Sequence, residues 1–340
     1  MLKKFLDKYD TVIFDMDGVM TSEQNYWSCA ALTVWEYLNH HSGKNVDARE
    51  CMERLPEIRR RVFCGDKLIA ELKGRGVNSN WDLGYVTVLI SWITGGRNGW
   101  GNFEKVLRYA QGLGDNILDE FDSLADKAAA ATGFNAASLR RNGVVWETMH
   151  TIFQEWYLGD ELMGHEAMNC PGKSGLLFGE EPIVDKDKLI RLVNEISQTK
   201  RTCIGTGRPE IEMLQPLRDW GIIDCFAKNG LCSFDDVMRA EESLRTGALT
   251  KPHPYMFLKA LYGTDYDDAK LVSGDYDRSM IEKTLIIGDA GADILAAKAM
   301  GADFCAVLTG VTGEKARGYF EELGAEYILK NVLEMGEYDG

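Results

Sequence analysis

The sequence of 340 residues predicts an α/β protein with a doubly wound parallel sheet, interrupted by a large and mostly helical insert. Two observations lead to this fold class. Near the start of the chain and again after residue 180, short apolar runs are followed by helical patterns, and such alternation is typical of β-α-β units. Residues 22–180 instead contain long amphipathic stretches with few strand-like runs.

The first strand is expected at Thr11–Phe14, where a β-branched and apolar run ends at Asp15-Met16-Asp17-Gly18. An uninterrupted apolar run that stops at a glycine turn is typical of a strand buried on both faces. Further strands are expected at Arg201–Gly205, Ile222–Ala227, Thr284–Ile287 and Phe304–Leu308. Helices between them are expected at Lys188–Ile196, Glu210–Trp220, Pro254–Leu261 and Ala292–Met300.

The insert carries helical periodicity over most of its length. The amphipathic stretches lie around Trp27–His40, Ala48–Leu72, Phe103–Tyr109, Ile117–Ala131 and Ala137–Tyr157. A glycine-rich break at 95–101 is a candidate substrate loop. We therefore expect two domains, an α/β core formed by residues 1–21 and 181–340 and a helical domain formed by residues 22–180.

Charge and composition restrict the partners. The chain has 38 Lys and Arg residues against 53 Asp and Glu residues, which gives a formal charge of −15. This surface field repels nucleic-acid backbones and anionic membranes, so neither is an expected partner. The eight cysteines form no C-x-x-C pair and are interpreted as reduced thiols. No apolar run has the length of a signal peptide or a membrane span, so we expect a cytoplasmic protein.

Three familiar catalytic motifs fail on inspection. Gly172-Lys173-Ser174 resembles the end of a phosphate-binding P-loop, but the glycine required five positions earlier is Ala167. His165-Glu166 begins like a zinc-protease helix and lacks the second histidine. No serine stands in a G-x-S-x-G elbow.

A pair of carboxylates follows the first predicted strand. Asp15 and Asp17 stand at i and i+2, where ligand sites of open α/β sheets are found. Two like charges at this spacing are unfavourable without compensation. The pair therefore predicts either a bound hard metal ion or one carboxyl group with a raised pKa.

Other polar residues stand near the ends of later predicted elements. Thr206 and Gly207 close a strand and offer a hydroxyl and an accessible backbone N–H, as phosphoryl oxygens require. Lys251 precedes a helix, and Asp289 and Asp293 follow another strand. The carboxyl ends of parallel strands share one edge of the sheet, so these residues are expected to form one acidic site with one cationic donor.

Each of these residues also has a purely structural interpretation. Asp15 and Asp17 could cap the strand end, Thr206 could cap the following helix, and Lys251 could be a surface lysine. Asp289 and Asp293 could be acidic residues favoured at a helix start. The sequence leaves the role of Arg208 open between a substrate contact and the surface. Asp275-Tyr276-Asp277 precedes a strand and is interpreted as a loop.

Taken together and in this order, the four blocks resemble the motifs of the haloacid dehalogenase (HAD) superfamily of phosphohydrolases. The resemblance covers residues 9–21 and about 181–335. It implies a Rossmann-like HAD core in which Asp15 attacks phosphorus and forms an aspartyl-phosphate. It also implies that Asp17 protonates the leaving oxygen and then activates water.

The resemblance further implies a Mg²⁺ cofactor and a phosphate site. The metal would be held by the Asp15 carboxylate, the Asp17 backbone carbonyl and the Asp289 carboxylate, with Asp293 nearby or bound through water. The transferring phosphoryl group would be bound by Thr206, the Gly207 amide and Lys251.

The presence of Asp17 argues against the dehalogenase and phosphonatase branches of the superfamily, because their reactions have no leaving-group oxygen to protonate. An insert directly after the first motif resembles the helical cap of the phosphoglycolate phosphatase and β-phosphoglucomutase groups, although it is longer. Its hinges would lie near Met20–Glu23 and Pro171–Pro182. We expect a magnesium-dependent phosphatase acting on a small phosphorylated metabolite. A phosphomutase and a non-catalytic binding or regulatory protein are the alternatives, and the oligomeric state stays open.

Overall fold

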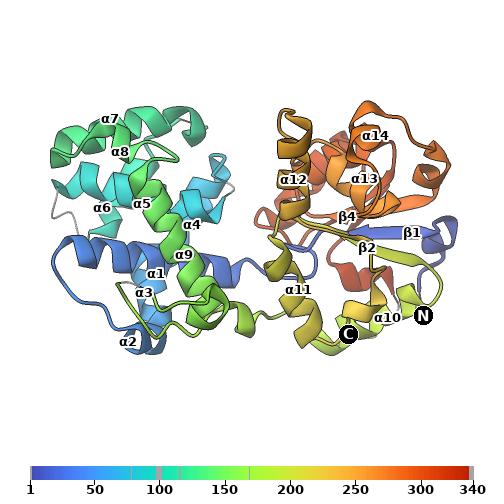
Figure 1. Ribbon diagram of the computed structural model, residues 1–340, viewed down its shortest axis with the longest axis horizontal. Coiled ribbons are helices and arrows are strands. Elements are labelled where there is room, and N and C mark those ends of the chain that lie inside the picture. Colours follow the sequence, from blue (N-terminus) through green and yellow to red (C-terminus); the bar gives the residue numbers. More distant parts are fainter. Residues whose placement is uncertain (1, 78, 97–101, 115, 168, 337–340) are drawn as a thin grey trace. The chain divides into compact units, whose positions relative to one another are not determined.

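The chain divides into two compact units, Met1–Glu23 with Glu180–Gly340 and Gln24–Gly179 (Figure 1). The computed structural model describes residues 2–77, 79–96, 102–114, 116–167 and 169–336. Most of the glycine-rich break at 95–101 lies outside these described residues.

The first unit is built on a six-stranded sheet in which every pair of neighbouring strands is parallel. The strand order is β3-β2-β1-β4-β5-β6, which is the order of doubly wound nucleotide-binding sheets. The predicted fold class is confirmed. The strands are β1 (Thr11–Phe14), β2 (Arg201–Gly205), β3 (Leu231–Cys232), β4 (Thr284–Gly288), β5 (Asp303–Val307) and β6 (Tyr327–Leu329).

Helices cover both faces of this sheet because successive strand residues point to opposite sides. Ile13 joins one buried cluster with α12, α13, α14, α15 and α16, whereas Val12 and Phe14 join another with α10 and α11. The helices are α10 (Lys186–Ser197), α11 (Glu210–Asp219), α12 (Phe234–Leu244), α13 (Tyr255–Tyr262), α14 (Asp268–Ser273), α15 (Gly291–Met300) and α16 (Arg317–Glu322).

One predicted strand is wrong. Residues Ile222–Ala227 contain a 3₁₀ turn at Ile223–Cys225, and the third strand lies further on at Leu231–Cys232. The buried side chains of this run are Ile222 and Phe226. In a strand Asp224 would lie on the same face as these two residues, but it is exposed, so the burial pattern does not match the alternation of a strand. The loop expected at Asp275–Asp277 is confirmed.

In the described part of the second unit, the regular elements are helices. The helices are α1 (Gln24–His41), α2 (Ala48–Glu53), α3 (Leu55–Val62), α4 (Lys67–Gly74), α5 (Asn80–Gly95), α6 (Phe103–Ala110), α7 (Phe121–Thr132), α8 (Ala136–Leu139) and α9 (Val144–Met163). In its centre α1, α5 and α9 pack against one another. Among the described helices of the chain, none has both the length and the apolar character needed to cross a lipid bilayer.

Two features of this unit differ from the sequence pattern. The stretch Ala48–Leu72 forms three helices, because Pro56 starts a new helix at α3 and Asp66 has a positive φ before α4. The helix α5 was not expected. Every residue from Asp82 to Trp92 is buried, and a helix buried on all sides shows no amphipathic period.

The two ends of this unit meet. The Asn25 side-chain amide, at the start of α1, donates hydrogen bonds to the carbonyl oxygens of Leu176 and Gly179, each at 3.1 Å. The helical unit is therefore closed on itself where the chain enters and leaves it.

Lys173, from the failed P-loop motif, is a buried structural lysine. Its ammonium group lies 2.8 Å from Glu36 and 2.7 Å from Glu155, and its side chain is 0% exposed. The Trp156 indole N–H donates to the same oxygen of Glu36. Burial raises the pKa of Glu36, and Lys173 opposes that rise. The lysine thus compensates two buried carboxyl groups that come from α1 and α9.

We expect Lys173→Met to lower the free energy of unfolding of the helical unit by about 3–5 kcal/mol, because it leaves buried carboxylates without their cation. Urea unfolding followed by tryptophan fluorescence measures this, since seven of the eight tryptophans lie in residues 24–179. The triple variant Lys173→Met, Glu36→Gln, Glu155→Gln should recover part of the loss. An unchanged unfolding midpoint in Lys173→Met would contradict this account.

Candidate active site

The strand order of the sheet reverses between β1 and β4, and the site lies at the carboxyl ends of these two strands. In open α/β sheets the connections diverge at this point and leave a crevice for ligands. Phe14 is paired with Ile287, which sets Asp15 level with Gly288 and next to Asp289. The register of the sheet therefore brings two distant motifs to one place.

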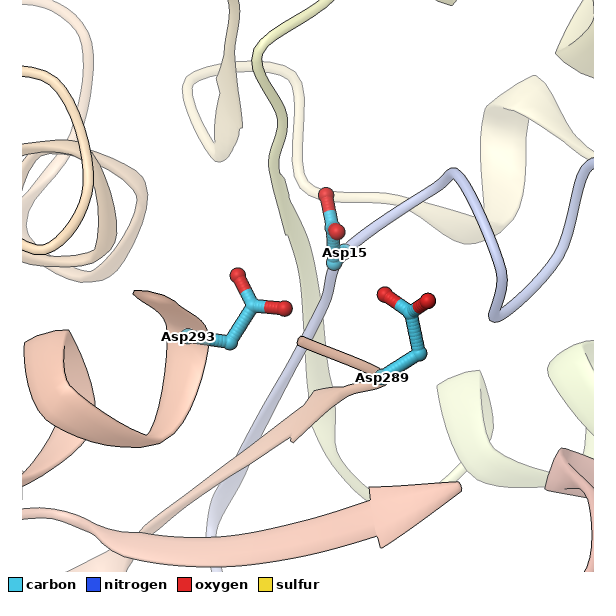
Figure 2. Close-up of side chains that lie close together, drawn as sticks. All are labelled: Asp15, Asp289 and Asp293. Atoms are coloured by element: carbon cyan, nitrogen blue, oxygen red, sulfur yellow. The ribbon is translucent and has the colours of Figure 1, made fainter. Parts of the chain in front are cut away.

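Three carboxylates face a shared space there (Figure 2). Asp15 follows β1, Asp289 follows β4, and Asp293 lies in the first turn of α15. One oxygen from each lies within 4.8 Å of the others. The convergence of the first and last motifs, expected from the sequence, is present in the structure.

Asp293 serves the helix and the site together. Its Oδ2 accepts a hydrogen bond from the Ala290 backbone N–H at 3.1 Å, while its Oδ1 lies 2.8 Å from the Lys251 ammonium. Gly288 makes this position possible, since a Cβ there would lie 2.6 Å from the Cβ of Asp293. The helix-start interpretation and the site interpretation of Asp293 are therefore compatible.

Lys251 places one positive charge among these acids. Its ammonium group lies 2.9 Å from Asp15 Oδ1, and its side chain is 12% exposed. Burial lowers the pKa of Lys251, but the Asp15 and Asp293 carboxylates raise it more, so the ammonium stays charged. Phe257 of α13 lies beneath it, with the ring centroid 4.7 Å from Nζ. Lys251 is an ion-paired residue of the site and not a surface lysine.

The acids outnumber this cation. Burial raises the pKa of Asp15 to about 7, with Asp293 and Asp17 adding to the rise and Lys251 opposing it. Burial raises the pKa of Asp289 well above its usual value, and the nearby Asp293 and Asp15 carboxylates add to this rise. A further positive charge would stabilise this group of carboxylates, and their oxygens are the ligands that Mg²⁺ prefers. The donor set therefore fits a magnesium ion.

Two glycines give the Asp289 carboxylate its place. A Cβ at Gly18 would lie 2.1 Å from Asp289 Oδ2, and one at Gly310 would lie 2.0 Å from the same oxygen. Gly310 belongs to the loop after β5, which is held by a hydrogen bond from the Thr309 hydroxyl to the Gly18 carbonyl oxygen at 2.5 Å. This loop is not among the site elements expected from the sequence. Its only signal was its position after a predicted strand at the same sheet edge.

Asp17 is arranged differently from the three clustered acids. Its carboxylate accepts hydrogen bonds from the Arg208 guanidinium, the shortest at 2.6 Å, and from the Thr21 hydroxyl at 3.0 Å. The sequence left Arg208 open between substrate and surface. In the structure the Arg208 guanidinium contacts the Asp17 carboxylate, and the Arg208 side chain is buried. Glu180, a second partner of Arg208 at 3.2 Å, was also missed.

Thr206 and Gly207 follow β2, the neighbour of β1. The Thr206 hydroxyl accepts a hydrogen bond from the Arg208 backbone N–H at 3.2 Å. It does not cap α11, whose N-cap residue is Pro209. Gly207 is exposed, and a Cβ there would meet nothing within 4 Å. These two residues stand on the same sheet edge as Asp15.

Comparisons with known proteins agree with this architecture. Residues 248–335, which include Lys251, Asp289 and Asp293, match a family model described as HAD-hydrolase-like. A crystal structure from the Northeast Structural Genomics Consortium shares 25% identity, with a TM-score of 0.81, over 96% of this chain and 97% of that chain. Comparison with curated proteins gives no significant match.

Two further structures are more distant. A phosphatase from Thermococcus thioreducens shares 17% identity, covers 86% of this chain and 90% of its own, and has a TM-score of 0.49. A haloacid dehalogenase-like hydrolase from Streptococcus pneumoniae shares 13% identity, covers 96% and 97%, and has a TM-score of 0.44.

The family match and the strand order confirm the resemblance recognised from the motifs. The α/β unit has a HAD-like fold.

We expect Gly310→Ala to weaken binding of Mg²⁺ at this site by about 10-fold or more, because the new methyl group displaces the Asp289 carboxylate. Isothermal titration calorimetry with MgCl₂ measures the change. Gly318→Ala is the matched control, since a Cβ at Gly318 in α16 meets nothing within 4 Å. Equal Mg²⁺ affinity in the two variants would rule out the role given to the glycine.

Proposed function

We propose that the protein is a magnesium-dependent phosphatase that cleaves a small phosphorylated metabolite through an aspartyl-phosphate on Asp15. The observation that carries this proposal is the contact of Asp15 with the Lys251 ammonium, 2.9 Å away, beside two further acids at the switch point of the sheet. A carboxylate attacks a phosphate dianion only where positive charge offsets the repulsion. Lys251 supplies part of that charge.

In the first step of this mechanism, an Asp15 oxygen forms a bond to phosphorus and the bond from phosphorus to the leaving oxygen breaks. Asp17 gives a proton to that oxygen, which departs as the alcohol. In the second step, water attacks phosphorus and the electron pair of the phosphorus–Asp15 bond returns to the Asp15 carboxylate. Asp17 takes the proton released by water.

The phosphoryl group would be bound by Lys251, the Thr206 hydroxyl and the Gly207 amide. Lys251 is held between Asp15 and Asp293 and can exchange a carboxylate contact for a phosphoryl oxygen. The exposed backbone at Gly207 lets an oxygen approach without a steric barrier. The residues that we propose to hold Mg²⁺ are Asp15 and Asp289 through carboxylates and Asp17 through its backbone carbonyl, with Asp293 nearby. The ion would neutralise charge on the nucleophile and the phosphoryl oxygens.

We also propose that residues 22–180 act as a cap domain for residues 1–21 and 181–340. Caps exclude water while the phosphoryl group is transferred and select the substrate. The chain enters the helical unit within a few residues of the Asp15-Met16-Asp17-Gly18 turn.

The decisive test is Asp15→Asn, which keeps the shape of the side chain and removes the nucleophile. We expect wild-type protein to release phosphate from p-nitrophenyl phosphate only with Mg²⁺, and the variant to lose at least about 10³-fold in kcat. Phosphate release at equal folded concentration is the measurement. Asp275→Asn, in an exposed loop of the core, is the matched control and should retain full activity.

Magnesium-dependent release that survives in Asp15→Asn would contradict the proposed nucleophile. Absence of any magnesium-dependent release by the wild-type protein would contradict the phosphatase. A requirement for a sugar bisphosphate before turnover would instead identify a mutase.

A further inference from the structure

The guanidinium of Arg208 is buried at the centre of a network that reaches Asp17. The Arg208 residue is 1% exposed. Its Nε lies 3.1 Å from each Asp17 oxygen, and its Nη2 lies 2.6 Å from Oδ1 and 3.2 Å from Glu180 Oε1. A buried charge with this many donors holds its partners in one geometry.

The two oxygens of Asp17 are bonded unequally. Oδ1 accepts from Arg208 Nη2 at 2.6 Å, from Arg208 Nε at 3.1 Å and from the Thr21 hydroxyl at 3.0 Å. Oδ2 accepts only the 3.1 Å contact from Nε among the described residues. The Asp17 side chain is 33% exposed, in contrast to the buried guanidinium. Oδ2 therefore has fewer hydrogen-bond partners than Oδ1 and is the better placed of the two to bond a reacting group.

Arg208 is itself fixed from several sides. Its backbone N–H donates to the Thr206 hydroxyl at 3.2 Å, and its carbonyl accepts from the Phe234 N–H at 2.8 Å. Glu180, which holds the guanidinium, accepts a hydrogen bond at its own carbonyl oxygen from the Trp220 indole at 3.2 Å. These bonds link the guanidinium to the phosphate-binding turn of the proposed site and to the segment by which the chain re-enters the core.

We propose that Arg208 is a positioning residue that orients Asp17 for the proton transfers of the reaction, with Glu180 fixing Arg208 in turn. The inference rests on the proposed phosphatase function. In the hydrolytic step the water oxygen bonds to phosphorus, the phosphorus–Asp15 bond breaks, and the released proton goes to Asp17 Oδ2. Arg208 touches neither phosphorus nor water in this scheme and acts through Asp17.

p-Nitrophenyl phosphate separates positioning from a purely structural role. Nitrophenolate leaves with little help from an acid, so formation of the aspartyl-phosphate depends weakly on Asp17. Hydrolysis of the aspartyl-phosphate still needs Asp17 as a base. A fault in the orientation of Asp17 therefore slows the second step selectively, whereas partial unfolding removes active molecules and lowers both steps equally.

The experiment uses the full chain with Mg²⁺ and compares the wild type with Arg208→Lys, which keeps the charge and loses the planar donor fork. Stopped-flow measurement should show a burst of about one nitrophenolate per folded variant molecule, followed by turnover about 10- to 100-fold slower than wild type. Because only the second step is slowed, kcat and KM should fall together and kcat/KM should stay within about threefold.

Arg201→Lys is the matched control. Arg201 lies at the other end of β2 and its guanidinium donates to Asn229 at 2.8 Å, so its substitution should leave both kinetic phases unchanged. Glu180→Gln provides a second variant should Arg208→Lys fail to fold. This variant keeps the Arg208–Asp17 contact and weakens the contact between the guanidinium and residue 180. Its burst should persist, and its turnover should fall by a smaller factor than in Arg208→Lys.

Unchanged turnover in folded Arg208→Lys, or in Glu180→Gln where the first variant does not fold, overturns the positioning role while the phosphatase stands. A burst that shrinks in parallel with turnover also overturns it, because Arg208 then supports only the fold. A wild-type protein without magnesium-dependent turnover overturns the proposed function and this inference together.

Discussion

The Lys251 ammonium lies between two buried carboxylates, 2.9 Å from Asp15 and 2.8 Å from Asp293. Buried carboxyl groups at the end of a sheet are unfavourable unless they are paired. Lys251 pairs with two of the acids, but burial, with smaller contributions from the Asp293 and Asp17 carboxylates, still raises the pKa of Asp15 to about 7. The close glycines and the bonded loop after β5 hold the third acid, Asp289, in the same small space. The turns at the carboxyl ends of the strands are arranged so that Lys251 and the three acids lie together.

The main site residues could be predicted because their place depends on topology. Asp15, Asp289 and Asp293 lie at ends of parallel strands or one turn beyond, and such ends share one edge whatever the details of packing. Lys251 follows no strand, and its place in the site was expected only from its order among the motifs. The strands β1, β2, β4 and β5 were predicted from their apolar runs, because a strand buried on both faces has an uninterrupted apolar sequence.

The features that were not predicted depend on contacts between distant residues. The role of Arg208 required knowing that its long side chain reaches Asp17 and Glu180. No spacing in the sequence carries that information. The helix α5 was missed because it is buried on all sides. The third strand was misplaced because the buried residues Ile222 and Phe226 flank a 3₁₀ turn and do not belong to a strand. Hydrophobic periodicity identifies helices and strands that have one solvent-exposed face, and it says little about elements that are buried on all sides.

The hydrogen bonds from Asn25 to Leu176 and Gly179 close the helical unit where the chain enters and leaves it. A segment whose two ends meet can be exchanged for another of different length without stretching the strands that carry it, because the host chain must bridge only a short gap. The α/β core and the helical unit can therefore diverge at different rates. Selection on the proposed cap can act on substrate choice, while Asp15, Lys251 and Asp289 stay under the separate constraint of their shared charge.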